Sequence, residues 1–268
     1  MVQLSLIGKN AIVTGAGQGI GKAISLKLAE AGANVAVVDI SMDNAKQTAS
    51  EVSAHGVKGK AYKVDVTDPE AMDTLADTVA KEWGSLDIIV NNAGIGHCVL
   101  FQDSNLEQFN RLIDVNLKGV YNGCHAAIKH MIKQKSGKIV NVSSAAGKKG
   151  YIYHSLYSPT KFGVIGLTQA LAIEAASSNI NVNAICPGIV RTPIWEKNLS
   201  DMIPDGENMD EIQEQREQLF NATLEQSIPL GRPQSAEDMA NGVLFLCSEM
   251  AANITGQALN INGGQLFN

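Results

Sequence analysis

The sequence predicts an α/β chain built on a doubly wound parallel sheet. Along most of the 268 residues, short apolar runs alternate with longer segments of helical periodicity. The apolar runs are nearly continuous, which is typical of strands that helices bury on both faces. A glycine-rich turn directly follows the first run and opens a helical pattern. We therefore expect a single domain over residues 1–268.

The same patterns predict the individual elements. A helical pattern occupies residues 22–31, and a polar one occupies residues 42–54. Ser235 and Asp238 form a capping-box-like start for a helix that reaches about Ser248. The runs expected to form strands are residues 10–14, 34–39, 59–66, 86–91, 137–142, 181–186 and 258–261.

The composition excludes several classes of function. The formal net charge is −6 and no basic tract occurs, so neither a nucleic-acid surface nor docking to an anionic membrane is expected. No apolar stretch reaches the length of a membrane span, and residues 1–10 lack a secretory pattern, so we expect a cytoplasmic location. The four cysteines are far apart and are interpreted as buried thiols, not as a metal site or a redox pair.

One segment, residues 193–229, interrupts the alternation of strands and helices. A proline stands at each of its ends, and the segment is strongly acidic. A connection of this length usually has structure and a function of its own, so we expect one or two helices that form a mobile lid over a substrate pocket. Residues 211–224 have helical composition, with Ile212, Leu219 and Phe220 as candidate apolar contacts.

The glycine-rich turn, Gly15-Ala-Gly-Gln-Gly-Ile-Gly21, predicts a phosphate site. Backbone N–H groups and a helix N-terminus at such a turn can receive a pyrophosphate. Asp39 ends the next strand, where a carboxylate can accept hydrogen bonds from the ribose diol of adenosine. The same charge would repel a 2′-phosphate and no Arg follows at position 40 or 41, so NAD is favoured over NADP. The alternative is that Asp39 is an ordinary turn residue.

A tyrosine and a lysine stand one helical turn apart in Tyr157-Ser-Pro-Thr-Lys161. On a helix this spacing places the ammonium beside the phenol. A free phenol titrates near pH ~10, so a neighbouring positive charge would lower its pKa and suit it to acid–base work. Pro159 is tolerated in the first turn of a helix, so Tyr157 should lie near a helix start. The alternative is that Tyr157 and Lys161 form an exposed helix pair without a function, because such pairs have the same spacing.

Several motifs in register resemble the short-chain dehydrogenase/reductase family over essentially the whole chain. Asn116 and Ser144 stand in the family's order before Tyr157-x3-Lys161. The other motifs are Thr14-Gly-x3-Gly-x-Gly21, Asn91-Asn-Ala-Gly94 and Pro187-Gly188. The resemblance implies a Rossmann-type fold and an NAD-dependent oxidoreductase that acts on CH–OH groups without a metal.

The resemblance also implies a role for each matching residue. Tyr157 would be the general acid or base on the substrate oxygen, and Ser144 would hydrogen-bond that oxygen. Lys161 would bind the nicotinamide ribose and lower the pKa of Tyr157, while Asn116 would hold a water of a proton relay. The other cofactor contacts would be Gly15, Gln18, Gly19, Ile20, Gly21, Asp39, Asp65, Val66, Asn92, Ala93, Gly94, Pro187, Gly188, Ile189, Val190 and Thr192.

The expected substrate is a small neutral secondary alcohol or ketone. Thr192-Pro-Ile-Trp195 and the ending Gly263-Gly-Gln-Leu-Phe-Asn268 are similar to the diacetyl/acetoin reductase, 2,3-butanediol dehydrogenase and polyol dehydrogenase branch. Ala145 departs from that branch, which often has Gln after the serine. The acidic lid disfavours an anionic substrate. The expected substrate contacts are Ser144, Ala145, Tyr157 and Trp195.

Three alternatives remain open at this point. A hexitol-phosphate dehydrogenase would use Lys148 and Lys149 near the phosphate. A 3-oxoacyl reductase shares the same motifs. A catalytically silent, dinucleotide-binding regulatory protein would share the fold, although the intact Ser144, Tyr157 and Lys161 argue against it. His97 and His154 fall in loops that should approach the pocket, where a packed or solvated histidine is the ordinary interpretation.

The end of the chain predicts self-association. Leu259, Ile261, Leu266 and Phe267 would form an apolar edge that a monomer has little left to cover. The family resemblance implies a homotetramer with two-fold interfaces through helices near residues 107–132 and 158–176.

Overall fold

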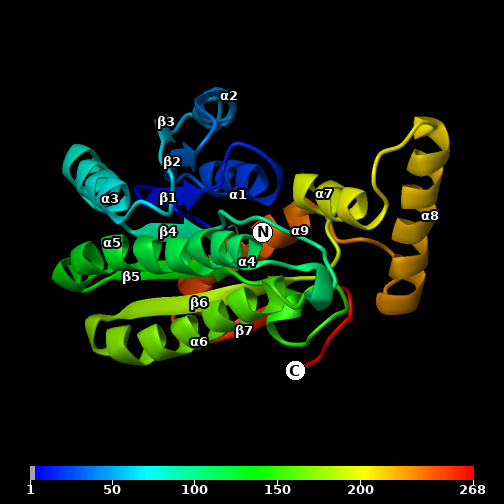
Figure 1. Cartoon of the computed structure of the whole chain (residues 1–268). Coiled ribbons are helices and arrows are strands. Elements are labelled where there is room, and N and C mark those ends of the chain that lie inside the picture. Colours follow the sequence, from blue (N-terminus) through cyan, green and yellow to red (C-terminus); the bar gives the residue numbers. More distant parts are fainter. Residues whose placement is uncertain (1–3) are drawn as a thin grey trace.

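The computed structural model describes residues 4–268 and contains one seven-stranded sheet in that range. Neighbouring strands are parallel throughout, in the order β3-β2-β1-β4-β5-β6-β7. The doubly wound α/β fold predicted from the sequence is confirmed (Figure 1). The strands are β1 (Asn10–Thr14), β2 (Asn34–Asp39), β3 (Gly59–Lys63), β4 (Ile88–Asn91), β5 (Gly137–Val142), β6 (Ile180–Pro187) and β7 (Ala258–Ile261).

Helices cover both faces of the sheet, and a hydrophobic cluster fills each interface. Successive residues of a strand point to opposite faces, so Val13 joins one cluster and Ile12 the other, and both are fully buried. One face carries α1 (Gly19–Glu30), α2 (Met42–Ser53) and α9 (Ala236–Cys247), and the other carries α3 (Pro69–Trp83), α5 (Gly119–Gln134) and α6 (Tyr157–Ala175).

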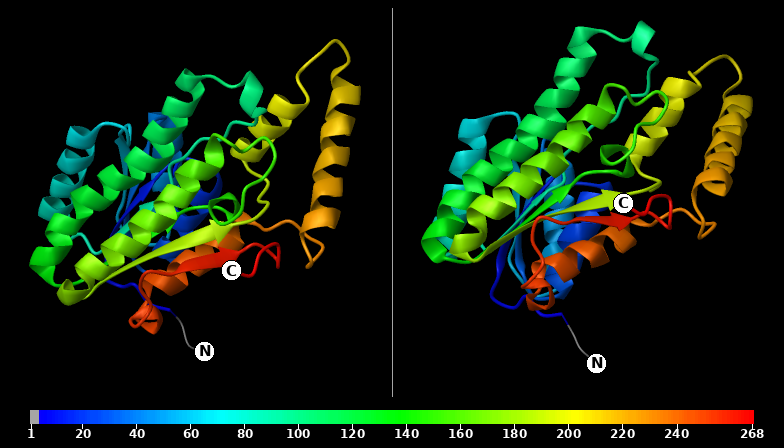
Figure 2. Two further views of the ribbon diagram at one scale, coloured as in Figure 1. Left: turned by 60° about the horizontal axis from the view of Figure 1, so that its bottom comes forward. Right: turned by 90° about the horizontal axis from the view of Figure 1, so that it is seen from below.

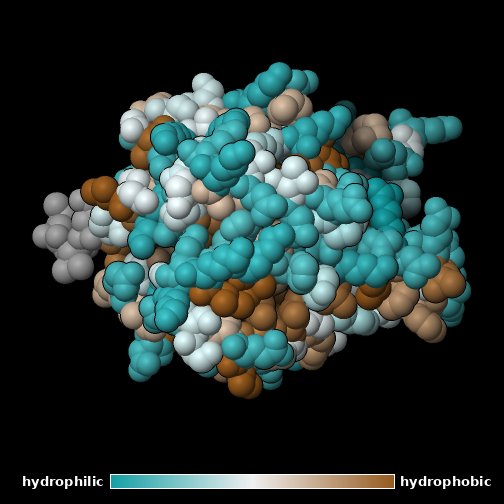
Figure 3. All heavy atoms as spheres, turned by 90° about the vertical axis from the view of Figure 1, so that its left-hand side faces the viewer, coloured by the Kyte–Doolittle hydropathy of each residue, from teal (hydrophilic) through white to brown (hydrophobic). Residues whose placement is uncertain are grey.

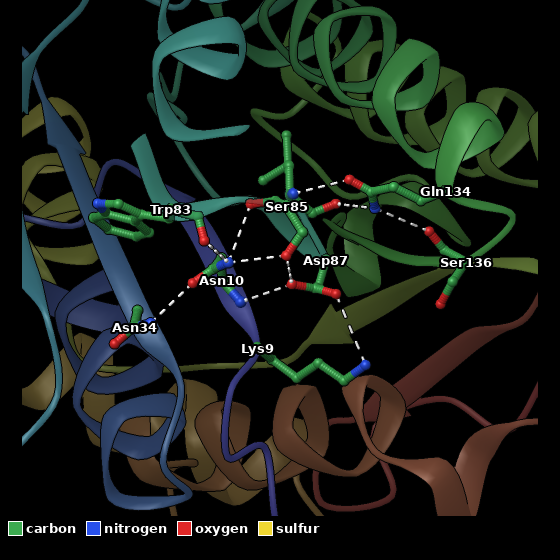
Figure 4. A network of polar contacts seen from close by, with 9 residues as sticks. Lys9, Asn10, Asn34, Trp83, Ser85, Asp87, Gln134 and Ser136 are labelled. Atoms are coloured by element: carbon green, nitrogen blue, oxygen red, sulfur yellow. Dashed lines mark hydrogen bonds and ion pairs between the residues drawn. The ribbon is translucent and has the colours of Figure 1, made fainter. Parts of the chain in front are cut away.

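A polar network joins the amino-terminal ends of the central strands (Figure 4). Asn10, the first residue of β1, donates from its side-chain amide to Ser85 Oγ at 2.9 Å and accepts from Asn34 Nδ2 at 2.8 Å. The Asn10 N–H donates to the Asp87 carboxylate at 3.0 Å. These contacts fix β1, β2 and the start of β4 to one another at this edge.

Two strands are shorter than the sequence predicts. β4 begins at Ile88 because the side chain of Gln134 bonds both backbone groups of Leu86, each at 3.0 Å. β3 ends at Lys63 because the chain turns at Asp65, whose carboxylate accepts the backbone N–H of the second residue along at 2.9 Å.

The connection between α4 (Leu106–Ile113) and α5 contains a π-helical turn, Asp114–Lys118. Such turns are rare and occur frequently at functional sites. The sequence did not predict this one, and it contains Asn116, which is fully buried.

Residues 193–229 form two helices, as predicted: α7 (Pro193–Met202) and α8 (Met209–Ser227). Both lie beyond the carboxyl ends of the strands, and α8 stands at the margin of the molecule (Figures 1 and 2). Of the three expected apolar contacts, Phe220 is buried and Leu219 packs beside it in a small cluster between the helices. Ile212 lies outside that cluster.

The described residues agree with the expectations for membrane spans and for the cysteines. Among the described residues, no helix has the length and apolar character needed to cross a membrane. The face drawn in Figure 3 is mostly hydrophilic, with hydrophobic side chains gathered in its lower part. All four cysteines are free and buried, as predicted. The expectation for residues 1–10 falls partly on residues 1–3, which lie outside the described residues.

The predicted apolar edge at the end of the chain is only half present. Leu259 and Phe267 are exposed. Ile261 and Leu266 are only partly exposed, and Ile261 packs against the hydrophobic cluster under α1 and α9.

Candidate active site

The candidate site lies where the strand order reverses. β1 and β4 are neighbours at the centre of the sheet, and their crossovers lead to opposite edges. In open α/β sheets, ligands bind outside the carboxyl ends of the strands at such a point. The glycine-rich turn follows β1, and Asn92, Ala93 and Gly94 follow β4, so the two predicted cofactor segments lie side by side.

The glycine-rich turn requires glycine for two reasons. Gly15 and Gly19 have φ of 60° and 56°, in the left-handed region that side chains disfavour. A Cβ on Gly21 would stand 2.2 Å from the carbonyl oxygen of Gly15 and 2.4 Å from the Asn92 amide, which leaves no room for one. The same amide donates to the carbonyl oxygens of Thr14 and Gly15 at 2.9 and 3.1 Å. Asn92 therefore holds the turn against the loop after β4.

The N-terminus of α1 suits an anion. Gln18 is its N-cap but makes no side-chain cap bond, and the first turn, which includes Ile20, contains no acidic residue. The leading N–H groups and the positive end of the helix dipole therefore face outward without a competing carboxylate. Thr192 lies across from this turn, because a Cβ on Gly19 would come within 3.9 Å of its methyl group.

Asp39 lies beside the same turn. Its carboxylate accepts the N–H of Gly17 and the N–H of Ser41, each at 2.9 Å. A carboxylate has about four acceptor positions, so two remain for the hydroxyls of a ribose. The site fits a nicotinamide dinucleotide. Asp39 can hold the backbone of the turn and bind the ribose at the same time. The sequence did not indicate that position 17 requires a glycine. In the structure a Cβ on Gly17 would stand 2.8 Å from Asp39 Oδ2, which leaves no room for a side chain.

Asn116 is fixed in the π-helical turn by both groups of its side chain. Its Oδ1 accepts the N–H of Ile95 at 2.8 Å, and its Nδ2 donates to the carbonyl oxygen of Ile95 at 2.9 Å. A Cβ on Gly94 would lie 3.2 Å from Asn116 Oδ1 and 3.6 Å from Lys161 Nζ. The structure thus brings Gly94, Asn116 and Lys161 together at one point.

Tyr157 is the first residue of α6, as predicted from Pro159. Lys161 is buried one turn later, and its Nζ donates to the carbonyl oxygen of Val142 at 2.9 Å and lies 5.7 Å from the centre of the Tyr157 ring. Ser144 lies beside the phenol and caps a short 3-10 turn by accepting the N–H of Ala146 at 3.1 Å.

The pKa of Tyr157 is shifted upward, whereas a downward shift was expected. Burial raises the pKa of the Tyr157 phenol to about 12, and the Ser144 hydroxyl only partly opposes this. Burial also lowers the pKa of Lys161 to about 8. Desolvation disfavours the charged form of each group, and it is the main cause of both shifts. Tyr157 therefore holds its proton at neutral pH.

The remaining predicted cofactor residues line the same edge of the sheet. Asp65 is exposed and Val66 is buried against α5. Pro187 ends β6, and the buried residues Ile189 and Val190 lead on toward Thr192, which caps α7. Gly188 in this run has no room for a side chain, since a Cβ would stand 2.4 Å from Gln234 Oε1.

Three other candidate residues, Ala145, Trp195 and Lys148, have contacts of their own within the protein. Ala145 is buried at the start of the 3-10 turn. Trp195 packs edge to face on Phe220, with ring centres 5.8 Å apart, inside the lid cluster. Lys148 donates to the main-chain oxygens of Ala258 and Asn268 at 2.6 Å each, so it holds the end of the chain.

One serine and one asparagine near the site make structural contacts. Ser143 donates to the carbonyl oxygen of Lys161 at 2.9 Å, and this bond fixes α6 against β5. Asn91 donates to Asn141 at 2.9 Å between adjacent strands. The family model for short chain dehydrogenase matches residues 9–203, which include all of these positions.

The chain belongs to the short-chain dehydrogenase family. As a member, it is an oxidoreductase that acts on CH–OH groups. The 3-oxoacyl-[acyl-carrier-protein] reductase of Thermotoga maritima is 39% identical over 263 residues, which cover 97% of this chain and 99% of that protein. Levodione reductase superimposes with a TM-score of 0.90 at 29% identity, over 97% of this chain and 98% of that one. The NAD+-bound xylitol dehydrogenase gives 0.87 at 32% identity, over 96% and 99%.

Proposed function

We propose that this short-chain dehydrogenase interconverts a ketone and a secondary alcohol, with Tyr157 as the proton donor and acceptor. The convergence of Tyr157, Lys161, Ser144 and Asn116 at the carboxyl edge of the sheet carries the proposal. A bound nicotinamide supplies or accepts the hydride. The protein side chains handle the proton and hold the reacting oxygen.

The proposed roles follow from the contacts of each residue. The Tyr157 phenol keeps its proton at neutral pH, so in the reducing direction it protonates the oxygen of the ketone. Ser144 lies beside it and donates to the same oxygen. Lys161 Nζ, beside Gly94, holds the nicotinamide ribose, and Asn116 lines the path by which Tyr157 is reprotonated. In the oxidising direction the phenolate must form, so we expect this direction to be favoured by high pH.

We propose NAD as the cofactor. Asp39 already accepts two backbone N–H groups, and its remaining acceptor positions suit ribose hydroxyls. A 2′-phosphate at the same place would meet the carboxylate, and the next residue, Ile40, is an exposed apolar side chain with no charge to compensate.

The first substrate class to test is a 3-oxoacyl thioester. Support comes from the curated relatives named 3-oxoacyl-[acyl-carrier-protein] reductase, which match the chain over nearly its whole length. The initial expectation of a small diol, acetoin or polyol is the second candidate. It is supported by the acidic lid, which disfavours an anionic substrate, and by the likeness to xylitol dehydrogenase.

One assay separates these candidates. NADH or NADPH oxidation is followed at 340 nm with a 3-oxoacyl thioester and acetoin, and reduction of NAD or NADP is followed with butanediol, xylitol and a hexitol phosphate. We expect turnover with NAD(H) and with the thioester, and a higher kcat/KM for acetoin or a polyol would favour the second candidate. No turnover with any of them would contradict the proposed oxidoreductase and favour a silent binding protein.

We also propose that the protein is a homotetramer and that the lid orders when ligands bind. Exposed apolar side chains on α5 and α6 support the assembly: Tyr121, Ile132, Phe162 and Ile173. Light scattering at micromolar concentration tests it, and a stable monomer would contradict it. Hydrogen exchange over residues 196–225 tests the lid, and equal rates with and without ligands would indicate a fixed wall.

A further inference from the structure

The loop at residues 95–99 connects the cofactor side of the site with the lid. It follows Gly94 directly, and both backbone groups of Ile95 bond to Asn116. The N–H of Val99 donates to the carbonyl oxygen of Tyr153 at 3.1 Å, just before α6. Between these anchors the loop packs on α7, since a Cβ on Gly96 would stand 2.7 Å from both Ile194 Cγ2 and Asn198 Oδ1.

A single carboxylate on α7 binds this loop. Asp201 Oδ2 accepts the N–H of Cys98 at 3.1 Å and lies 3.2 Å from His97 Nδ1, and only 10% of the Asp201 side chain is exposed. Lys197, one turn earlier on α7, pairs with the other oxygen but is well exposed. A buried carboxylate is costly unless it is hydrogen-bonded, so these contacts are specific. Ile194, Asn198 and Asp201 share one face of α7, and this face is the surface that meets the loop.

The contacts continue from the loop to the catalytic tyrosine. Cys98 Sγ lies 4.0 Å from His154 Nε2, and the ring of His154 packs edge-on against the ring of Tyr157, with centres 5.7 Å apart. His154 Nδ1 lies 3.0 Å from the carbonyl oxygen of Ile152, which assigns the proton to Nδ1 and leaves Nε2 as the acceptor. Burial raises the pKa of the Cys98 thiol to about 12, so it keeps its proton and can donate to that nitrogen.

We propose that Asp201 is a positioning residue for the reaction: it clamps α7 onto residues 95–99 and, through Cys98 and His154, sets the orientation of Tyr157. The inference rests on the proposed role of Tyr157. The geometry of the acid–base group is then complete only when the lid is docked, so substrate enclosure and proton transfer are coupled. A displacement of about 1 Å at a reacting group can cost on the order of 10²-fold in rate.

The experiment compares Asp201→Ala and Asp201→Asn with Glu207→Gln. Glu207 is exposed in the same lid, and the described residues give it no ion pair, so its variant controls for the loss of one negative charge. We expect Asp201→Ala to lower kcat/KM on the order of 10²-fold, mostly in kcat, with NAD affinity unchanged. Asp201→Asn retains an acceptor for the N–H of Cys98 but not the charge, so it should fall between wild type and Asp201→Ala. Glu207→Gln should match the wild type.

Hydrogen exchange gives a readout that does not depend on turnover. The Cys98 amide should exchange faster in Asp201→Ala than in the wild type, and residues 10–14 in the sheet should not change. Unchanged exchange at Cys98 would overturn the clamp, whatever the kinetics show. Faster exchange with a wild-type kcat would overturn the coupling to Tyr157. Tyr157→Phe, measured in parallel, tests the proposed function separately, because its retained turnover would refute the acid–base role without affecting the exchange result.

Discussion

The two ends of the parallel sheet differ in how completely their buried polar side chains are paired. At the amino-terminal end, Asn10, Ser85, Asp87 and Gln134 bond to one another or to nearby backbone groups (Figure 4). At the carboxyl-terminal end and in the lid beyond it, several buried polar atoms have no partner among residues 4–268: Asn91 Oδ1, His97 Nε2, Tyr151 Oη, Ser158 Oγ, Trp195 Nε1 and Asn198 Oδ1.

This difference separates stability from function within one sheet. A buried polar group without a partner costs about 1–3 kcal/mol, so a protein retains such groups where they serve another purpose. The buried ammonium of Lys161 lies at the carboxyl end, and burial lowers its pKa to about 8. We infer that the amino end stabilises the fold, whereas the carboxyl end carries groups that lower the stability of the fold but serve catalysis and binding.

The largest expected effect is at the carboxyl end. Tyr157→Phe removes the proton donor, so we predict a loss of turnover of at least ~10²-fold with little change in NAD affinity. Tyr153→Phe is the matched control, because Tyr153 lies in the preceding loop and is partly exposed. Steady-state kinetics with the best substrate measures both. Near-wild-type turnover in Tyr157→Phe would refute the assigned mechanism.

The next effect concerns cofactor choice. Asp39→Ala combined with Ile40→Arg should shift the preference from NAD toward NADP, because it removes the repelling carboxylate and adds a cation. We expect roughly 2–4 kcal/mol of discrimination in the wild type. The ratio of kcat/KM values for the two cofactors measures it, with Asp43→Ala on α2 as the control. Similar values for the two cofactors in the wild type would contradict the role of Asp39.

A smaller effect is expected at the amino end, and on stability alone. Asn10→Ala leaves the Ser85 hydroxyl and the Asn34 amide without one of their partners, so the free energy of unfolding should fall by about 2–3 kcal/mol while kcat stays unchanged. Asn105→Ala, which removes the exposed N-cap of α4, should cost only about 1 kcal/mol. Urea unfolding and the standard assay give both numbers. A reduced kcat in Asn10→Ala would show that the two ends are not separate.

Much of the fold and of the candidate site could be predicted because the signals are local. The helix start at Tyr157 follows from Pro159, and the position of Lys161 follows from helix geometry alone. The glycine-rich turn and Asp39 could be placed together because adjacent parallel strands end at the same edge. Patterns of this kind depend on residues that are close in the sequence or on adjacent strands, so the structure has them where the sequence predicts them.

The features that were missed depend on tertiary contacts. Asp201 meets His97 across 104 positions of the sequence, and no spacing rule connects them. The π-helical turn at Asn116 and the use of Gly17 by Asp39 likewise arise from packing. The expected direction of the pKa shift of Tyr157 was wrong because burial of the phenol, which the spacing of two residues does not reveal, raises its pKa.

Lys161→Met tests the central claim most directly, because one residue is predicted to affect stability and activity in opposite directions. Burial lowers the pKa of Lys161 from 10.5 to about 8, so below pH 8 the folded state bears the cost of a buried ammonium. Removing it should raise the free energy of unfolding at pH 7 by about 1–3 kcal/mol and abolish most turnover. The stabilisation should shrink as the pH rises from 8 to 10.5. Tm and kcat are measured on one preparation. A lower Tm at pH 7 would contradict the account, as would a stabilisation that grows with pH.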